Sequence, residues 1–327
     1  MARRLLKTIL VAIEFPQESR QVGLARAARL AQRLNARLTL VHCAFDPYAR
    51  PSHFTTADLA RRIEDSLATR RAGLERLARP LRRRGLKVAV RALWDYPPFE
   101  GIVREVLRSK PDLVVAETHS HVRGARLFLK NNDWQLIRLC PAPVLLVKKS
   151  SAYGKARVLA AIDPLHAHGR SLHLDERILE FAQAISAAHL GRLDVVHAYL
   201  PLSNMIAAGI SEPIVIPVDP QAERRHERDV KRAVDRVAGP LRLSQRQVHV
   251  DIGPPETVIS GLAKRLRADV VVMGAVSRRG LERIFVGNTA ERILESLPCD
   301  VLVVKPARFR TTVPRRPQHS RVLLAAI

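Results

Sequence analysis

Short apolar runs alternate with longer amphipathic stretches along most of the chain. In the first half, the apolar runs span residues 9–13, 38–44, 87–92, 113–116 and 144–147. Most of these runs lack polar alternation, which is typical of strands buried on both faces of a parallel sheet. The stretches with apolar residues at helical spacing span residues 18–34, 57–84, 97–109 and 134–139. Strands that alternate with helices predict a doubly wound α/β sheet, which binds ligands at the carboxyl ends of its strands.

The second half of the chain repeats the first. Residues 158–163 match residues 9–14, and residues 269–272 match residues 112–115. Further corresponding pairs are His42 with His197, Pro141 with Pro298, and Lys148 with Lys305. Self-similarity of this kind, carried over whole strands, indicates a duplicated structural unit.

The repeat predicts two homologous domains, residues 1–152 and 153–308. The link between them is short and polar, so we expect the halves to pack together rather than to swing freely. Residues 309–327 form a basic, proline-containing tail that we expect to be mobile. The final residues, 321–327, resemble residues 157–162; a vestigial strand, a duplicated edge and a swapped element are three open interpretations.

The second half contains an unusually apolar segment at residues 199–220. Leaving its large side chains in water would cost about 25 cal/mol per Å² of apolar surface. Two interpretations stay open: the segment folds as a lid over a ligand cavity, or it packs against the other domain. The candidate lid residues are Met205, Ile206, Ile210, Ile214 and Ile216.

Residues 270–305 form the unit around which the rest of the chain is organised. They begin and end with short apolar runs, between which lie a turn containing Gly and Ser and an amphipathic stretch. This order predicts a βαβ unit whose turn presents backbone N–H groups to an anion. Arg278 and Arg279 beside the turn could clamp a phosphate or an acidic head group, and a plain exposed turn is an equally good interpretation.

The net charge raises the question of nucleic-acid binding. The 327 residues carry a net charge of +24, with arginine as the main basic residue. Association with RNA or DNA predicts binding that falls steeply with salt. We favour a solvated basic surface, because the arginines are spread over every predicted helix.

The sequence offers little that points to catalysis. It lacks the P-loop, GxSxG and HExxH signatures of common kinases and hydrolases. Cys43, Cys140 and Cys299 lie far apart, which predicts buried thiols in a reducing compartment rather than disulfides. His119 and His121 have no Cys or carboxylate partner at ligand spacing, so no metal site is predicted. No apolar stretch approaches the about 18 residues of a membrane span, and we expect a soluble, cytoplasmic protein that is not an enzyme.

Nearly the whole chain resembles the tandem members of the universal stress protein family. The shared motifs are Asp163 after the first strand of the second half, Gly253–Pro254–Pro255–Glu256, the loop from Gly274 to Thr289, Cys299–Asp300, Asn132–Asp133–Trp134 and Cys140–Pro141. The resemblance implies two Rossmann-like domains, each a five-stranded parallel sheet of order 3-2-1-4-5. It also implies that such domains pair within the chain or as dimers, and that the protein has a cytoplasmic role in stress.

Nucleotide-binding members of this family carry G-x2-G-x9-G-[ST], where backbone amides hold the phosphates and an acid after the first strand meets the nucleoside. By position, the resemblance implies ligand contacts at Asp163, Val196, Gly274, Ser277, Gly287 and Asn288, to which we add the neighbours Met273, Arg279, Gly280 and Thr289. Two of these positions depart from the motif. Ser277 replaces a glycine, and its Cβ narrows the room for phosphate where the backbone needs a positive φ. Asn288 replaces Ser or Thr, although it can still donate to an anion.

The corresponding positions of the first half are Glu117, Ser120 and Lys130, so no glycine of the motif remains there. A carboxylate at Glu117 would repel phosphate. We therefore predict no nucleotide site in the first half.

The preferred hypothesis is a tandem universal stress protein without turnover, whose second domain binds one small ligand. The apolar segment and the altered phosphate loop favour a partly hydrophobic ligand, such as an acyl chain with a polar head, over ATP. The alternative is an ATP-binding, weakly hydrolysing member of the family, and a third hypothesis is association with nucleic acid. No obligatory cofactor is implied beyond such a ligand.

Overall fold

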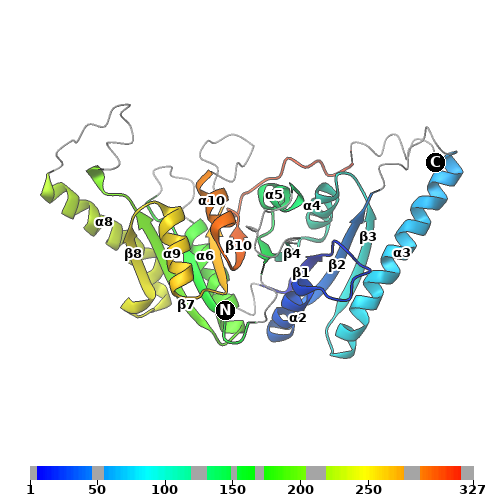
Figure 1. Ribbon diagram of the computed structural model, residues 1–327, viewed down its shortest axis with the longest axis horizontal. Helices are drawn as coiled ribbons and strands as arrows, with labels where there is room; N and C mark the ends of the chain where they lie inside the picture. The colour runs from blue at the N-terminus through cyan, green and yellow to red at the C-terminus, as the bar shows by residue number, and fades with distance from the viewer. Residues whose placement is uncertain are drawn as a thin grey trace. The chain divides into compact units, whose positions relative to one another are not determined.

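The chain folds into two compact units, which the computed structural model describes over residues 6–45, 55–118, 131–148, 153–165, 173–203, 219–275 and 288–317. Unit 1 contains the described residues from 6 to 148 and, in addition, residues 308–317 from the far end of the chain. Unit 2 contains the described residues from 153 to 307. Each unit is an α/β sandwich that contains five β-strands (Figure 1).

Unit 1 is built on a five-stranded parallel sheet. Its strands are β1 (Thr8–Ala12), β2 (Arg37–Ala44), β3 (Val88–Trp94), β4 (Leu113–Glu117) and β5 (Val144–Val147). Within this unit they lie in the order β3-β2-β1-β4-β5. The helices are α2 (Val22–Leu34), α3 (Thr56–Arg83), α4 (Pro98–Ser109) and α5 (Asn131–Leu139).

Unit 2 repeats this topology. Its strands are β6 (Arg157–Ala161), β7 (Arg192–Tyr199), β8 (Val248–Ile252), β9 (Val270–Gly274) and β10 (Asp300–Val304). They are parallel and lie in the order β8-β7-β6-β9-β10, which is again 3-2-1-4-5 in the numbering of a single repeat. The helices are α6 (Leu174–Ala188), α8 (Pro220–Ala238), α9 (Pro255–Arg265) and α10 (Asn288–Ser296), with 3-10 turns η1 (Gly239–Leu241) and η2 (Gln245–Gln247). The predicted fold class and strand order are thus confirmed for both halves.

Helices cover both faces of each sheet, as right-handed crossovers require. In unit 1, α3 packs on β2 and β3, while α4 lies against α5 on the opposite face (Figure 1). The central strands are consequently buried on both faces; in β4, Leu113, Val114 and Val115 have no exposed surface. This is why these strands appear in the sequence as continuous apolar runs without polar alternation.

Local signals fix where the helices begin. Helix α3 starts after Thr55, whose Oγ1 accepts a hydrogen bond from the Asp58 N–H at 3.2 Å, an N-cap that satisfies one of the free amides of the first turn. Helix α2 begins at Val22, later than the predicted residue 18. The difference arises because the Gln21 Nε2 donates to the carbonyls of Phe15 and Glu18, which holds the preceding segment in a turn.

The C-terminal tail differs from its prediction. Residues 308–317 belong to unit 1, where Val313 is buried and the Pro314 carbonyl accepts a hydrogen bond from Arg104 Nε at 3.0 Å. We predicted a mobile tail, and this part of it is instead packed on α4, because an apolar side chain and a backbone carbonyl find buried partners there. The segment 321–327 lies outside the described residues.

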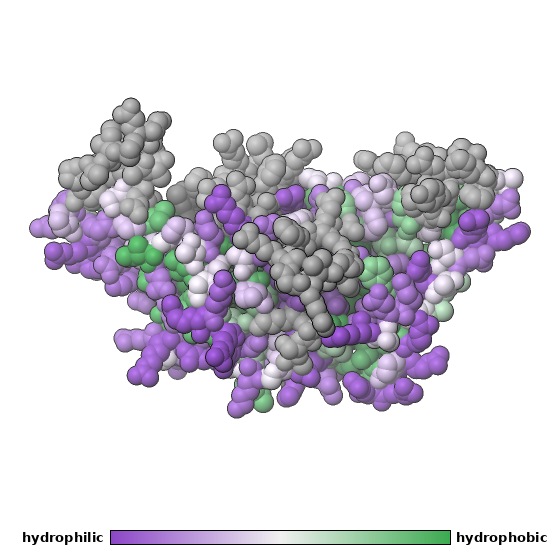
Figure 2. Space-filling model, in the orientation of Figure 1, coloured by the Kyte–Doolittle hydropathy of each residue, from purple (hydrophilic) through white to green (hydrophobic). Residues whose placement is uncertain are grey.

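The surface of the described residues is strongly polar. On the face shown in Figure 2, hydrophilic residues are spread over both units rather than gathered in one place. In the same described residues, no helix is both long enough and apolar enough to cross a membrane.

Candidate functional site

The carboxyl edge of the unit 2 sheet carries two carboxylates between β6 and α6. Asp163 follows β6, and its side chain is 67% exposed. Its backbone N–H donates to Oδ1 of Asp175, a buried residue in the first turn of α6, at 3.0 Å. The edge is therefore negatively charged where the start of α6 would otherwise attract an anion, so that phosphate groups are disfavoured at this point.

A buried histidine lies beside Asp163. His197 is 3% exposed, and its Nδ1 donates to the Ile162 carbonyl at 3.0 Å, which assigns the proton to that nitrogen because a carbonyl only accepts. The same Nδ1 is 4.0 Å from Asp163 Oδ1. The Nε2 atom of His197 is buried and has no hydrogen-bond partner among the described residues. A buried polar atom in this position costs about 1–3 kcal/mol unless a partner satisfies it.

Gly274 ends β9 at this edge, next to the first turn of α6. A Cβ placed on Gly274 would lie 2.7 Å from Leu174 Cδ2 and 3.2 Å from Ile178 Cδ1. The glycine thus lets α6 pack directly on the end of the strand. The surroundings of Gly274 are consequently apolar on the helix side.

The remaining predicted site residues are only partly visible. Val196 and Met273 are buried in β7 and β9, and the Val196 carbonyl accepts from the Ile162 N–H at 3.0 Å. Asn288 and Thr289 open α10. Ser277, Arg279, Gly280 and Gly287, together with the lid residues Met205, Ile206, Ile210, Ile214 and Ile216, lie outside the described residues. The structure therefore brings Asp163 and Val196 to one edge with Gly274, and the phosphate loop and the lid stay predictions.

In unit 1 the corresponding edge is filled by Glu117. Its Oε2 accepts a hydrogen bond from the Gly23 N–H, in the first turn of α2, at 2.8 Å. A carboxylate at a helix N-terminus is favoured by the free amides and by the helix dipole. The absence of a nucleotide site in unit 1 stays a prediction.

The two units place a carboxylate at different strand ends beside the first turn of the first helix. In unit 1 it comes from Glu117, at the end of β4, and reaches the N–H of Gly23, the second residue of α2. In unit 2 it comes from Asp175, the second residue of α6, and reaches the N–H of Asp163 after β6, whereas β9, the counterpart of β4, ends in Gly274. Only unit 2 leaves its strand end free of a side chain.

An ion cluster at the end of β3 was not predicted. The side chains of Arg104 and Asp95 are each 9% exposed, and Arg104 Nη1 lies 2.5 Å from Asp95 Oδ2. Arg104 also pairs with Glu100, one turn earlier on α4, and donates to the Pro314 carbonyl. The i,i+4 spacing of Glu100 and Arg104 is a signal available in sequence, whereas the contacts with Asp95 and Pro314 need the tertiary fold.

The thiol next to this cluster is not reactive. Cys43 is buried, and its Sγ donates to the Asp95 carbonyl at 3.6 Å. Burial, assisted by the charge of Asp95, raises the pKa of Cys43 to about 12. Because the thiolate is the nucleophilic form, this cysteine is a packing residue.

His42, the unit 1 counterpart of His197, gives a pH-dependent prediction. Its Nδ1 donates to the Ile13 carbonyl at 2.8 Å, and burial, followed by the nearby Arg70 charge, lowers its pKa below the ordinary 6.5. The folded protein then holds fewer protons here than the unfolded chain. We therefore expect stability to be lost as the pH falls through 6.5 toward the folded pKa.

The His42→Asn variant, whose amide can still donate to Ile13, should show a flatter loss of stability in this range. NMR titration of the His42 ring and urea unfolding between pH 5 and pH 8 test this expectation. A His42 titration midpoint at or above 6.5 would contradict it.

The fold agrees with the comparisons to known proteins. A profile of the Universal stress protein family matches residues 6–148 and 156–305, so this chain belongs to the universal stress protein family, with two such domains in tandem. The chain is similar to Universal stress protein E of Escherichia coli (strain K12), with 30% identity over 315 residues that cover 94% of this chain and 96% of that protein. It is also similar to the Universal stress protein E homolog of Haemophilus influenzae, with 28% identity over 92% of this chain and 98% of that one.

Solved structures show the same architecture over the full length. A putative universal stress protein from Pseudomonas aeruginosa UCBPP-PA14 superposes with a TM-score of 0.73 and 25% identity, covering 100% of this chain and 99% of that one. A universal stress protein from Archaeoglobus fulgidus shares the fold at a TM-score of 0.60 and 14% identity, covering 91% of this chain and 98% of that one.

Proposed function

We propose that this chain is a non-catalytic stress protein whose second half binds one small ligand at the carboxyl edge of β6, β7 and β9. The observation that carries the proposal is the difference between the two strand ends. Glu117 fills the edge of unit 1, whereas Gly274 leaves the edge of unit 2 without a side chain. Ligands of doubly wound sheets bind at this edge.

The chemistry of the edge favours a ligand with a polar head and an apolar body over a nucleotide. Asp163 and the Nε2 of His197 offer hydrogen bonds to hydroxyl or amino groups of a ligand head. The buried side chains of Leu174 and Ile178 make the surroundings of Gly274 apolar. Asp163 and Asp175 both oppose a triphosphate.

ATP is the second candidate, and Asp163 is the residue that favours it. In nucleotide-binding members of the family the acid after the first strand meets the nucleoside, and Asp163 occupies that position with a largely exposed side chain. A weakly hydrolysing role would follow from this candidate, while the preferred one involves no turnover.

Binding assays on matched variants distinguish these candidates. A fluorescent long-chain alcohol and a fluorescent ATP analogue are titrated into the wild type, Asp163→Asn and Glu14→Gln, the last being the same exchange at the corresponding position of unit 1. We expect saturable binding of the alcohol that weakens about tenfold in Asp163→Asn, as for the loss of one charge-assisted hydrogen bond, and that is unchanged in Glu14→Gln.

Two outcomes would contradict the proposal. Saturable binding of the ATP analogue that depends on Asp163, with none of the long-chain alcohol, would favour the second candidate. Equal loss in both variants, or no saturable binding of either probe, would rule out a ligand site at this edge of unit 2.

A further inference from the structure

Unit 1 contains a pocket at the opposite edge of its sheet, where the strands begin. The pocket has a volume of about 550 Å³ and lies at the amino ends of β1, β2 and β3, with the end of α4 as one wall. Its lining combines two cations, Arg37 and Lys87, with Thr39, and a largely apolar remainder that includes Leu10, Ala89 and Pro111. A volume of this size suits a small organic molecule.

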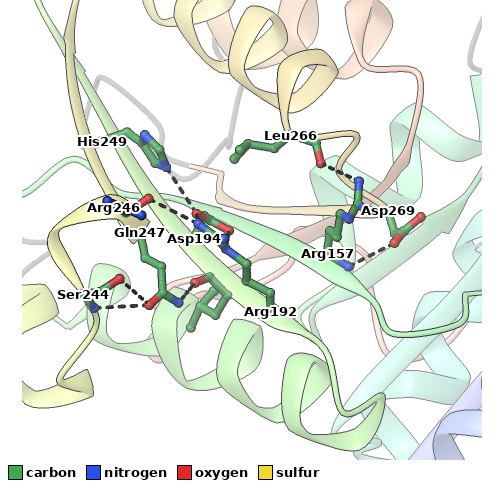
Figure 3. A network of polar contacts seen from close by, with 10 residues as sticks. Arg157, Arg192, Asp194, Ser244, Arg246, Gln247, His249, Leu266 and Asp269 are labelled. Carbon is green, nitrogen blue, oxygen red and sulfur yellow. Dashed lines mark hydrogen bonds and ion pairs between the residues drawn. The ribbon is translucent and has the colours of Figure 1, made fainter.

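Unit 2 shows what the repeat places at the same edge. There Arg192 binds the Asp194 carboxylate through two hydrogen bonds, Nε to Oδ2 and Nη2 to Oδ1, each of 2.9 Å (Figure 3). His249 Nε2 lies 3.3 Å from the same carboxylate, and Gln247 donates to the Leu193 carbonyl at 2.8 Å. Asp194 is 3% exposed. This edge of unit 2 is therefore filled by a carboxylate that a guanidinium holds at both oxygens.

The strand registers equate the two edges residue by residue. Arg37 and Arg192 are the first residues of β2 and β7, and they pair with the first residues of β1 and β6. Two positions further on, Thr39 in unit 1 corresponds to Asp194 in unit 2. On the neighbouring strand, the registers of β3 and β8 equate Ala89 with Gln247.

The substitutions explain why unit 1 has a pocket at this edge. Thr39 and Ala89 are shorter than Asp194 and Gln247, so that their truncation opens space beside Arg37. The arginine itself is retained, yet its side chain has no ion pair or hydrogen bond with any described residue. In unit 1 the strand therefore keeps the guanidinium of Arg37 but has Thr39 where unit 2 has the carboxylate of Asp194.

We propose that this pocket binds a small carboxylic acid, whose carboxylate takes the place that the Asp194 side chain occupies beside Arg192. Arg37 holds the carboxylate at both oxygens, and the Lys87 ammonium adds a second positive charge at the mouth. The apolar body of the acid lies on Leu10, Ala89 and Pro111. The site is independent of the one proposed in unit 2.

The structure favours a carboxylate over other anions. The guanidinium fork matches the two oxygens of a planar carboxylate, and unit 2 realises this match with two bonds of equal length. One fixed negative charge, Asp112, lies near the pocket, but its Oδ2 is already used by the Lys7 and Thr8 amides and the Thr8 hydroxyl. A planar monoanion is therefore a better fit than a dianion.

The test uses benzoate as the probe and benzamide as its neutral counterpart, both followed by saturation-transfer NMR on the full chain. Wild type should bind benzoate saturably and show no saturable signal with benzamide. Arg37→Gln should weaken benzoate binding at least about tenfold, the loss expected for a charge-assisted pair. Thr39→Asp installs the carboxylate of unit 2 and should abolish binding without lowering the thermal midpoint, because the chain already accommodates the same pair in its second half.

Two controls make the result specific. Arg83→Gln, which removes an exposed arginine of α3, should leave benzoate binding unchanged. Asp194→Thr, which changes the corresponding edge of unit 2, should also leave unchanged the part of the benzoate signal that Arg37→Gln removes. Benzoate binding that survives both Arg37→Gln and Thr39→Asp would overturn the proposal. So would displacement of benzoate by inorganic phosphate as readily as by acetate, since that would indicate a general anion site.

Discussion

Gly191→Ala is expected to destabilise unit 2 more than any other substitution of a glycine by alanine in that unit. Gly191 follows α6, where its N–H donates to the Ser186 carbonyl at 2.9 Å and the next amide, of Arg192, donates to the Ala156 carbonyl. A Cβ at Gly191 would lie 2.0 Å from the Ala156 oxygen and 2.8 Å from the Ala156 carbonyl carbon. These are backbone atoms at the start of β6, so they cannot rotate away.

We expect the free energy of unfolding to fall by about 3 kcal/mol, at the upper end for an overpacked site. Urea unfolding measures the loss, and hydrogen exchange should locate it in α6, β6 and β7. Gly154→Ala is the matched control, because a Cβ there meets no atom within 4 Å. Its unfolding should stay within about 0.5 kcal/mol of wild type. An equal loss in both variants would show that the close approach of residue 191 to β6 is not the cause.

Arg104→Met is expected to have the second large effect. The variant keeps an unbranched apolar stem but leaves Asp95, whose side chain is 9% exposed, and the 26% exposed Glu100 without their cation. Loss of one partner from a buried ion pair costs about 3–5 kcal/mol, because the remaining charge stays desolvated. We expect about 3 kcal/mol here, since Glu100 is partly in contact with water.

A combined variant separates the charge effect from lost packing. Adding Asp95→Asn and Glu100→Gln to Arg104→Met removes both orphaned charges and should recover more than half of the lost stability. Arg232→Met removes the cation of a solvent-exposed pair with Asp229 and should leave the urea midpoint unchanged. A triple variant no more stable than the single one would mean that Arg104 acts through its hydrogen bond to the Pro314 carbonyl rather than through its charge.

Most of the fold was predictable because burial on both faces leaves a clear mark in the sequence. Strands such as β4 and β9 appear as unbroken apolar runs, and their repetition predicted two sheets of the same order. The start of α2 was misplaced because a single side chain, Gln21, holds the preceding turn. The packing of the tail depends on the hydrogen bond between Arg104 and Pro314, two residues that lie far apart in the sequence.

The candidate site was predictable only in part. Asp163 and Gly274 could be placed because one follows and the other ends a strand of the repeat, whereas Val196, inside β7, was placed only by the family resemblance. The hydrogen bond that Asp175 accepts from the Asp163 N–H could not be predicted, because it depends on how the first turn of α6 packs against the end of β6. The pocket at Arg37 was missed for a related reason, because it results from two small residues on neighbouring strands, Thr39 and Ala89, whose register only the fold reveals.

The return of residues 308–317 to unit 1 has a consequence for biosynthesis. Translation delivers the amino-terminal unit first, and domains generally begin to fold in that order. Val313 and Pro314, which complete the packing around α4, leave the ribosome only after all of unit 2 has been made. Unit 1 is thus synthesised first but completes its packing last. A chain truncated after β10 would lack the residues that pack on α4 of unit 1.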